Sequence, residues 1–213
     1  MLFSSRLLRR RPPLILRANA AFAVSHFAER LGAMPVWRAR DVAAAAALLG
    51  ERLSWGRRQV GELAEAAKLL DVGLIGMPRG VTANPRSLSQ DEEELYQQHP
   101  VRSLELACGL GLMGEQLHGI MHHHERYDGS GFPMGFAGQE IPEFARILAI
   151  ADVYVQLTKP APGGVALTTE DALEEMLAQA GTHFDPRLVA VFAEVTRRRQ
   201  TTSGPLRTAG SRG

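Results

Sequence analysis

The sequence is poor in cysteine, in aromatic residues and in excess charge of either sign. Its single cysteine, Cys108, excludes an internal disulfide and fits a reducing compartment, and we expect it to pack as a small apolar residue. The 24 Lys and Arg nearly cancel the 23 Asp and Glu, so charge favours neither nucleic acid nor a membrane as partner. No stretch approaches the roughly 20 apolar residues that span a bilayer. We therefore expect a cytoplasmic protein with no nucleic-acid or membrane partner.

What the sequence does contain is typical of one globular domain, with 45% hydrophobic and 22% charged residues among 213. The first 28 residues carry five arginines and no acid, a composition that also suits a transit peptide. We interpret residues 1–33 as a basic extension and leave targeting as the alternative. Residues 197–213 have little to bury, which predicts a disordered basic tail. The domain is expected over residues 34–196.

The periodicity between these ends is helical. Alanine and leucine recur every three or four residues in 40–53 and 60–70, and strand-like alternation is absent. Ser89 and Glu92 form a Ser-x-x-Glu capping box, and Thr168 and Asp185 are placed to cap later helices. The sequence therefore predicts an all-α bundle of about seven helices with no sheet.

Candidate metal ligands concentrate in "MHHHERYDGSGFPMG", residues 121–135, where three histidines precede a glycine-rich turn. His118 lies one helical turn earlier, and His99, Asp71 and Asp152 are further candidates. Imidazole and carboxylate together suit Zn²⁺, Mn²⁺ or Fe²⁺. Taken singly, each of these residues could instead be a cap or a surface residue.

Several of these segments together resemble one family. "LLDVGLIGMP", "HP", "HHERYDGSGFPMGFAGQEIPEFARILAIADVY" and "THFDP" occur in the order and spacing of the HD-GYP proteins, and the resemblance covers residues 36–196. That family is a helical branch of the HD metal-dependent phosphohydrolases. Its characteristic members are bacterial enzymes that hydrolyse the second messenger cyclic di-GMP. The resemblance thus implies an HD-type helical bundle with a glycine-rich Gly-Phe-Pro loop.

The resemblance also assigns roles to individual residues. It implies that Asp71, His99, His123, His124 and Asp152 are metal ligands, with Asp71 also catalytic. His118 and His122 then become bystanders, with an adventitious metal pair as the alternative for them.

The chain departs from the family pattern at several of these positions. The signature His-Asp-x-Gly-Lys reads "LDVGL", so that Leu70 replaces a histidine ligand and Leu74 replaces a lysine. Arg38 stands where an upstream helix usually opens on a ligating histidine. Because leucine has no lone pair and arginine repels a cation, we expect at most one divalent transition metal, Fe, Mn or Zn, per chain.

The ligand-binding parts are altered as well. Gly-Tyr-Pro has become Gly-Phe-Pro at Phe132, and only Lys159 remains of a basic stretch that the family is thought to use for substrate phosphates. We keep Phe132 and Lys159 as ligand-binding candidates. The glycine-rich loop has an apolar tip that predicts a contact surface. The residues assigned to this interaction loop are Asp128, Gly129, Gly131, Phe132, Pro133 and Phe136.

Three interpretations of function remain open. The first is a degenerate HD-GYP domain with little or no phosphodiesterase activity. It would act as a binding module, with cyclic di-GMP as a weak ligand and a diguanylate cyclase or another signalling protein as partner. The second is a hydrolase that survives on a reduced metal site, and the third is a helical scaffold that binds nothing.

Overall fold

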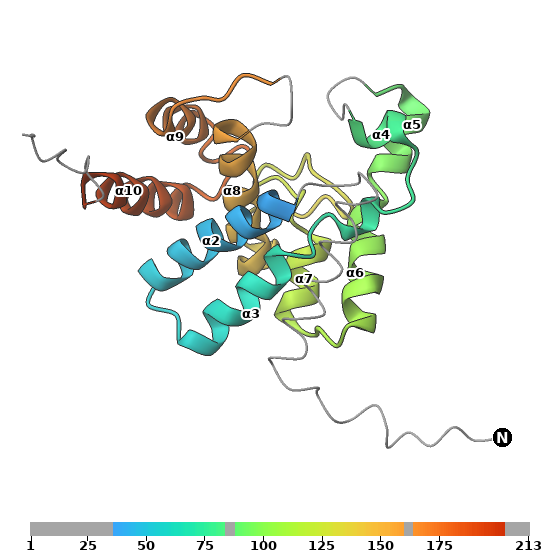
Figure 1. The fold of residues 1–213 in the computed structure, drawn as a ribbon, viewed down its shortest axis with the longest axis horizontal. Helices are drawn as coiled ribbons and strands as arrows, with labels where there is room; N and C mark the ends of the chain where they lie inside the picture. Colours follow the sequence, from blue (N-terminus) through green and yellow to red (C-terminus); the bar gives the residue numbers. More distant parts are fainter. Residues whose placement is uncertain (1–35, 84–87, 160–163, 203–213) are drawn as a thin grey trace, which may run out of the picture.

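A computed structural model describes residues 36–83, 88–159 and 164–202, and within these residues the regular structure is helical (Figure 1). This confirms the all-α prediction. One isolated bridge joins Ala180 and Phe184. The helices are α2 Val36–Arg52, α3 Arg57–Ala67, η2 Val72–Leu74, α4 Arg79–Ala83, α5 Gln90–Tyr96, α6 His99–Gly109, α7 Glu115–Met121, η3 Gly138–Glu140, α8 Glu143–Thr158, α9 Thr169–Ala178 and α10 Pro186–Thr202.

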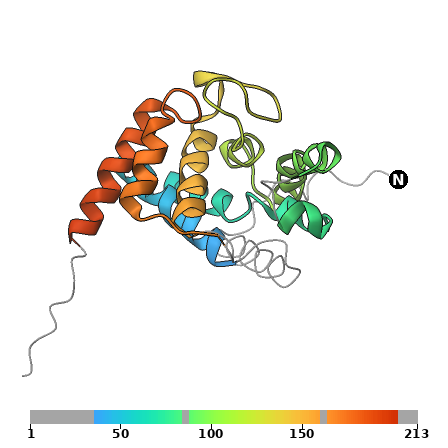
Figure 2. The same cartoon turned by 90° about the horizontal axis from the view of Figure 1, so that it is seen from above.

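Four helices form the centre of the bundle. Helix α2 packs against α3 and α8, and α7 packs against α8, α6 and α3. Helices α9 and α10 flank α8 on one side, while α4 and α5 lie at the opposite end (Figures 1 and 2). The core is formed by apolar residues that recur at helical spacing. Among its fully buried members are Leu49, Leu63, Ile147, Leu148 and Phe192. This core positions the helices and the segments between them that carry the candidate site residues.

The predicted helix starts are present. Ser89 Oγ accepts a hydrogen bond from the Glu92 amide, and the Glu92 carboxylate accepts one from the Ser89 amide. These two bonds complete the capping box. Thr168 caps α9 and Asp185 accepts the first amides of α10. Helix α10 continues to Thr202, past residue 197, where a tail was expected to begin. Residues 1–33 and 203–213 lie outside the described part of the chain.

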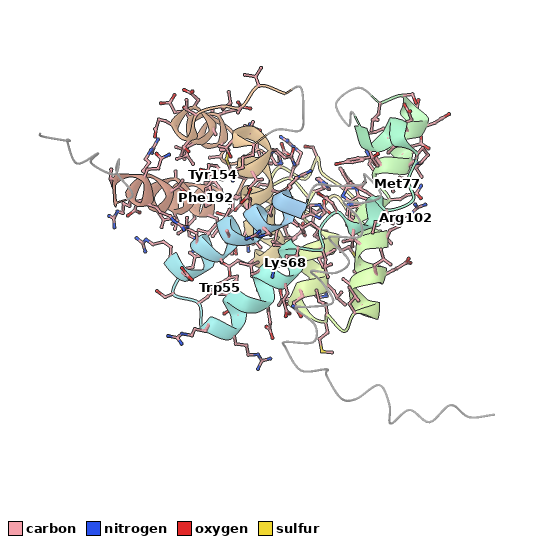
Figure 3. The ribbon with its side chains drawn as sticks, viewed as in Figure 1. Trp55, Lys68, Met77, Arg102, Tyr154 and Phe192 are labelled. Carbon is pink, nitrogen blue, oxygen red and sulfur yellow. The ribbon has the colours of Figure 1, made fainter. Side chains whose placement is uncertain are left out.

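Tyr154 and Phe192 lie where two helices meet (Figure 3). The rings of Tyr154 on α8 and Phe192 on α10 lie 5.1 Å apart, so α10 is packed on the domain by an aromatic contact. Cys108 is exposed, and the expectation that it packs inside is wrong. Because successive residues on a helix point about 100° apart, Ser103 and Ala107 occupy the buried face of α6 and turn Cys108 outward. Within the described residues no helix has the length and apolarity to cross a bilayer.

Candidate metal centre

The first half of the candidate site depends on a close approach between two backbones. Asp71 lies at the start of η2, and His99 is the first residue of α6. A Cβ atom on Gly73 would lie 2.2 Å from the His99 carbonyl oxygen and 2.7 Å from the Ser103 nitrogen. Glycine is therefore required here, and the Gly73 amide also donates to Ser103 Oγ at 2.8 Å. This contact fixes the position of Asp71 relative to His99.

The second half follows the end of α7. Backbone carbonyls orient two of the imidazoles: His123 Nδ1 donates to the Ile120 oxygen at 2.7 Å, and His99 Nδ1 donates to the Tyr96 oxygen at 2.8 Å. Each ring thereby presents Nε2 as the nitrogen with a free lone pair. Such an outer hydrogen bond is how proteins fix the tautomer of metal-binding histidines.

Four side chains, which we call the four-donor cluster, converge at one point: Asp71, His99, His123 and His124. One possible ligand atom from each lies within 4.8 Å of the others. Asp71 Oδ1 is 3.5 Å from His99 Nε2 and 3.8 Å from His123 Nε2. His99 Nε2 is 3.1 Å from His124 Nε2.

The chemistry of these donors fits one divalent transition metal. His123 Nε2 is buried without a hydrogen-bond partner among the described residues, although a buried polar atom normally has one. Burial lowers the pKa of His99 to about 4 and holds the pKa of His124 well below its ordinary value, so both rings are neutral near pH 7. Neutral imidazole is the form that ligates a metal.

Asp71 stays ionised in this buried setting. Burial by itself raises the pKa of Asp71, but the Arg38 guanidinium and the neighbouring His123 and His99 more than offset it, and the net pKa is lowered. The cluster therefore offers one carboxylate and three imidazoles, a set that suits Zn²⁺, Mn²⁺ or Fe²⁺.

Asp152 lies outside the four-donor cluster. Arg38 Nη2 donates to Asp152 Oδ1 at 2.7 Å and lies 3.5 Å from Asp71 Oδ2. Gln156 Nε2 donates to the other Asp152 oxygen at 2.5 Å. Burial alone lowers the pKa of Arg38, but Asp152 and Asp71 reverse the effect and the net pKa is raised, so the guanidinium is always charged. Arg38 thus occupies the space between the two acids.

The two leucines of "LDVGL" are packed in apolar clusters and are not metal ligands. Leu70 is buried in the main core, and Leu74 packs with Met77 and Val81 in a small separate cluster. Neither side chain can coordinate an ion.

The interaction loop folds back onto the histidines. Phe132 stacks on His124 with ring centres 4.7 Å apart, and Phe136 stacks on His122 at 5.0 Å. A Cβ atom on Gly131 would lie 2.3 Å from the Arg126 nitrogen. Met134, with 56% of its surface exposed, is the large apolar residue that this loop presents to solvent.

The loop begins with a hydrogen-bonded turn at Asp128–Ser130. Asp128 accepts the Ser130 amide at 2.9 Å, and Gly129 adopts the left-handed conformation at φ 81°. The peptide bond before Pro133 is cis.

Glu125 was not among the predicted site residues, yet it holds this loop in place. Its buried carboxylate accepts the amides of Met134 at 2.8 Å and Gly135 at 3.0 Å. His122, expected to be a bystander, lies with Nδ1 3.4 Å from the same carboxylate, whereas His118 is exposed. An acid directly before a glycine-rich turn is the signal that was available, because the amides of such a turn need an acceptor.

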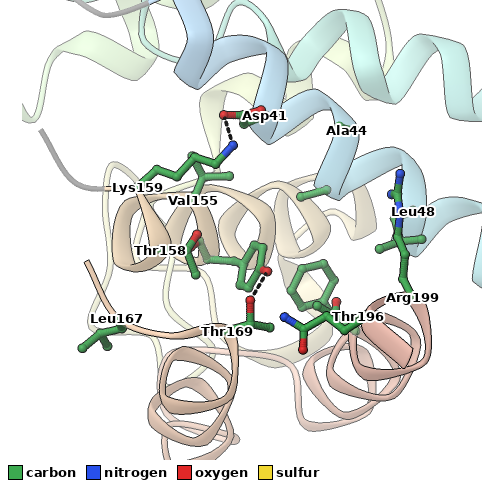
Figure 4. Close-up of a pocket in the computed structure, with 14 residues that line it drawn as sticks. Asp41, Ala44, Leu48, Val155, Thr158, Lys159, Leu167, Thr169, Thr196 and Arg199 are labelled. Atoms are coloured by element: carbon green, nitrogen blue, oxygen red, sulfur yellow. Dashed lines mark hydrogen bonds and ion pairs between the residues drawn. The ribbon is translucent and has the colours of Figure 1, made fainter. Parts of the chain in front are cut away.

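Lys159 lies apart from the four-donor cluster. It pairs with Asp41 at 2.8 Å on the wall of a cavity of about 460 Å³ between α2, α8 and α10 (Figure 4). Ala44, Leu48 and Val155 give that cavity an apolar lining (Figure 4). The structure therefore brings together four of the five predicted metal ligands and leaves Lys159 on a different surface.

The chain is similar to several known proteins. A family model described as an HD domain matches residues 4–188. The cyclic di-GMP phosphodiesterase response regulator RpfG of Xanthomonas campestris pv. campestris is 37% identical over 169 residues, which cover 78% of this chain and 45% of that protein. A 3'3'-cGAMP-specific phosphodiesterase 2 of Vibrio cholerae is 33% identical over 137 residues, covering 61% and 25%. The chain thus spans less than half the length of these curated relatives.

Solved structures share the fold. A cyclic GMP-AMP specific phosphodiesterase of Vibrio cholerae superposes with a TM-score of 0.69 at 20% identity, over 88% of this chain and 50% of that one. An HD-GYP-type protein of Bdellovibrio bacteriovorus superposes with a TM-score of 0.64 at 15% identity, over 84% and 62%. At these identities the likeness concerns the fold alone.

Proposed function

Because the chain belongs to the HD domain family, and within it to the HD-GYP proteins, we propose that it is a degenerate member of that branch. In this proposal it has little or no phosphodiesterase activity, holds at most one divalent metal per chain, and acts as a binding or interaction module in cyclic di-GMP signalling. Cyclic di-GMP is then a weak ligand.

One observation carries this proposal. Arg38 pairs with both Asp152 and Asp71, so the carboxylate that could serve a second ion is already engaged by a cation. The four-donor cluster would hold the one remaining ion, which supplies Lewis acidity toward a phosphoryl oxygen when bound. Losing one ion of a pair costs several factors of ten in rate, since a single electrostatic contact is worth about 10²- to 10³-fold.

Metal content and hydrolysis of cyclic di-GMP, measured on the same purified protein, test the proposal. We expect at most one transition metal per chain by elemental analysis, and hydrolysis barely above a metal-only blank. Two metals per chain would contradict the first expectation. Linear dinucleotide or GMP formed at about 1 per second or faster would contradict the second.

The second candidate function is a hydrolase that survives on one metal. It is favoured by the intact four-donor cluster, in which Asp71 would remain the catalytic carboxylate. Restoring the signature with Leu70→His and Leu74→Lys should raise metal content before it raises the rate. Both leucines are buried, so the restored polar groups also carry a folding cost of about 1–3 kcal/mol each.

The interaction role rests on the loop over the histidines. We propose that it contacts a diguanylate cyclase or another signalling protein, with Met134 as the exposed contact and with Phe132 and Phe136 supporting it from below. Pull-downs should recover less partner with Met134→Ser, Phe132→Ala or Phe136→Ala. Met113→Ser is the matched control, because Met113 is 41% exposed outside this loop. Equal recovery by all variants at unchanged thermal melting would make the loop a structural flap.

A further inference from the structure

Arg38 and the four-donor cluster share one carboxylate. Asp71 turns Oδ1 toward His99 and His123, at 3.5 and 3.8 Å, and its Oδ2 lies 3.5 Å from the Arg38 guanidinium. An ion in the cluster and the guanidinium would therefore lie on the two sides of the same acid. One carboxylate would then lie between two positive centres. In a two-metal site, a pair of metal ions provides the same arrangement.

The charges of the site give Arg38 a defined electrostatic effect. The carboxylates of Asp71 and Asp152 outnumber the single guanidinium, so the site is negative without a metal. A divalent ion reverses this sign. If Arg38 were neutral, the same ion would only balance the two carboxylates, and nothing would remain to attract an anion. Both the ion and the arginine are needed for a net positive site.

The Arg38 side chain is also more exposed than the two acids with which it pairs. The Arg38 side chain is 23% exposed, whereas the side chains of Asp71 and Asp152 are 6% and 4% exposed. Both carboxylate contacts use Nη2, and Nη1 has no hydrogen bond to any described residue. His124 is the half-buried member of the cluster, and the other three members are buried. Guanidinium N–H groups in a planar fork suit phosphate oxygens.

We propose that Arg38 takes the place of a second metal ion as a permanent cation, so that a phosphate group binds between its guanidinium and one ion in the four-donor cluster. The ligand class is a phosphate ester, whether a free monoester or a nucleotide diester. The inference rests on the proposed function only for the single metal.

Binding of inorganic phosphate tests this assignment. The full chain is loaded with one equivalent of Mn²⁺ and titrated with phosphate by calorimetry, beside metal-free protein. We expect saturable binding by the loaded wild type and none by the metal-free protein. Arg38→Met should weaken binding about 10- to 100-fold, because charged hydrogen bonds are lost and the net charge falls to zero. Arg52→Met is the matched control, since Arg52 is a surface residue paired with Glu194 and its loss changes the total charge equally.

A second variant covers the case in which Arg38→Met fails to fold. Arg38→Met together with Asp152→Asn removes both members of the 2.7 Å pair, so that Asp71 is the one carboxylate left, and it faces the bound ion. It should fold, take up one Mn²⁺, and bind phosphate more weakly than wild type because the guanidinium donors are gone. Arg38→Lys keeps the charge and should retain more affinity than Arg38→Met.

The outcomes separate the two proposals. Wild-type phosphate affinity in the double variant, or equal affinity with and without Mn²⁺, would overturn the role of Arg38. One metal per chain with no phosphate binding by wild type would also overturn it, while leaving the proposed function standing. Two metals per wild-type chain would overturn the proposed function and the replacement of an ion by Arg38 together. Equal losses in Arg52→Met and Arg38→Met would reduce the effect to overall charge and so reject the site.

Discussion

The two sides of the Asp71 carboxylate are built from different chemistry. On the Oδ1 side lie three imidazoles, one of which, His123, has a buried Nε2 with no hydrogen-bond partner among the described residues. On the Oδ2 side lie Arg38 and Asp152, joined by a 2.7 Å ion pair. The first side has an unpartnered nitrogen suited to an ion, and the second already holds a cation. Arg38, one residue of α2, thus places a cation on one side of a shared carboxylate and leaves the other side to the donors of the four-donor cluster.

Removing one imidazole of the four-donor cluster should abolish tight metal binding. His123→Ala deletes one donor of four, and with it a ring that the Ile120 carbonyl holds in the ligating orientation, so the affinity for the ion should fall steeply. We expect the metal content of the purified protein to fall from one per chain to nearly none by elemental analysis. His118→Ala, on an exposed side chain, should leave the metal in place. A metal-loaded His123→Ala protein would show that the ion lies elsewhere.

Removing the acid of the arginine side should cost stability and spare the metal. Asp152→Asn leaves the largely buried Arg38 with Asp71 alone, and breaking a buried ion pair costs about 3–5 kcal/mol in the free energy of unfolding. Urea denaturation measures this loss. Metal content decides between two roles for Asp152: one ion per chain places it outside the ligand set, and loss of the ion would make it a ligand, as the family resemblance implies.

In the metal-free protein, the histidine side and the arginine side should lose their contributions to stability in different pH ranges as the pH falls. His99 has a pKa of about 4 in the fold against 6.5 in the unfolded chain, so the unfolded chain binds protons first as the pH falls. Its contribution of about 3 kcal/mol is complete above pH 6.5 and is lost as the pH falls to about 4. The pKa of Asp71 is lowered from 3.8, so the contribution of the arginine side is present above pH 3.8 and is lost only below it.

Urea midpoints between pH 3 and 8, in the presence of a chelator, measure this dependence. The variant His99→Gln cannot titrate at this position and should make the slope between pH 6.5 and 4 shallower, while His124, whose pKa is lowered as well, keeps part of it. A wild-type midpoint that stays constant across that window would contradict the assignment of the loss to His99.

Much of the fold followed from local sequence, and part of the site did not. Alanine and leucine periodicity and the caps at Ser89, Thr168 and Asp185 act over a few residues, so helices could be predicted from them. That Asp71, His99, His123 and His124 meet came from the family resemblance, because no local rule joins segments so far apart. The Arg38–Asp152 pair spans 114 positions, and its geometry depends on how α2 packs against α8.

Glu125 provides the smallest expected effect and the finest test of the histidine side. The carboxylate accepts the amides of Met134 and Gly135, whereas the amide of Glu125→Gln offers one oxygen and turns an N–H group toward the other donor. The loss is about 1 kcal/mol, measured as a fall in thermal midpoint of a few degrees. Glu140→Gln is the control, since Glu140 accepts one amide, that of Ala137, and is exposed. Hydrogen exchange should accelerate at Met134 and Gly135 in Glu125→Gln alone. Unchanged exchange at those two amides would mean that the stacked rings of Phe132 on His124 and Phe136 on His122 hold the loop without the carboxylate.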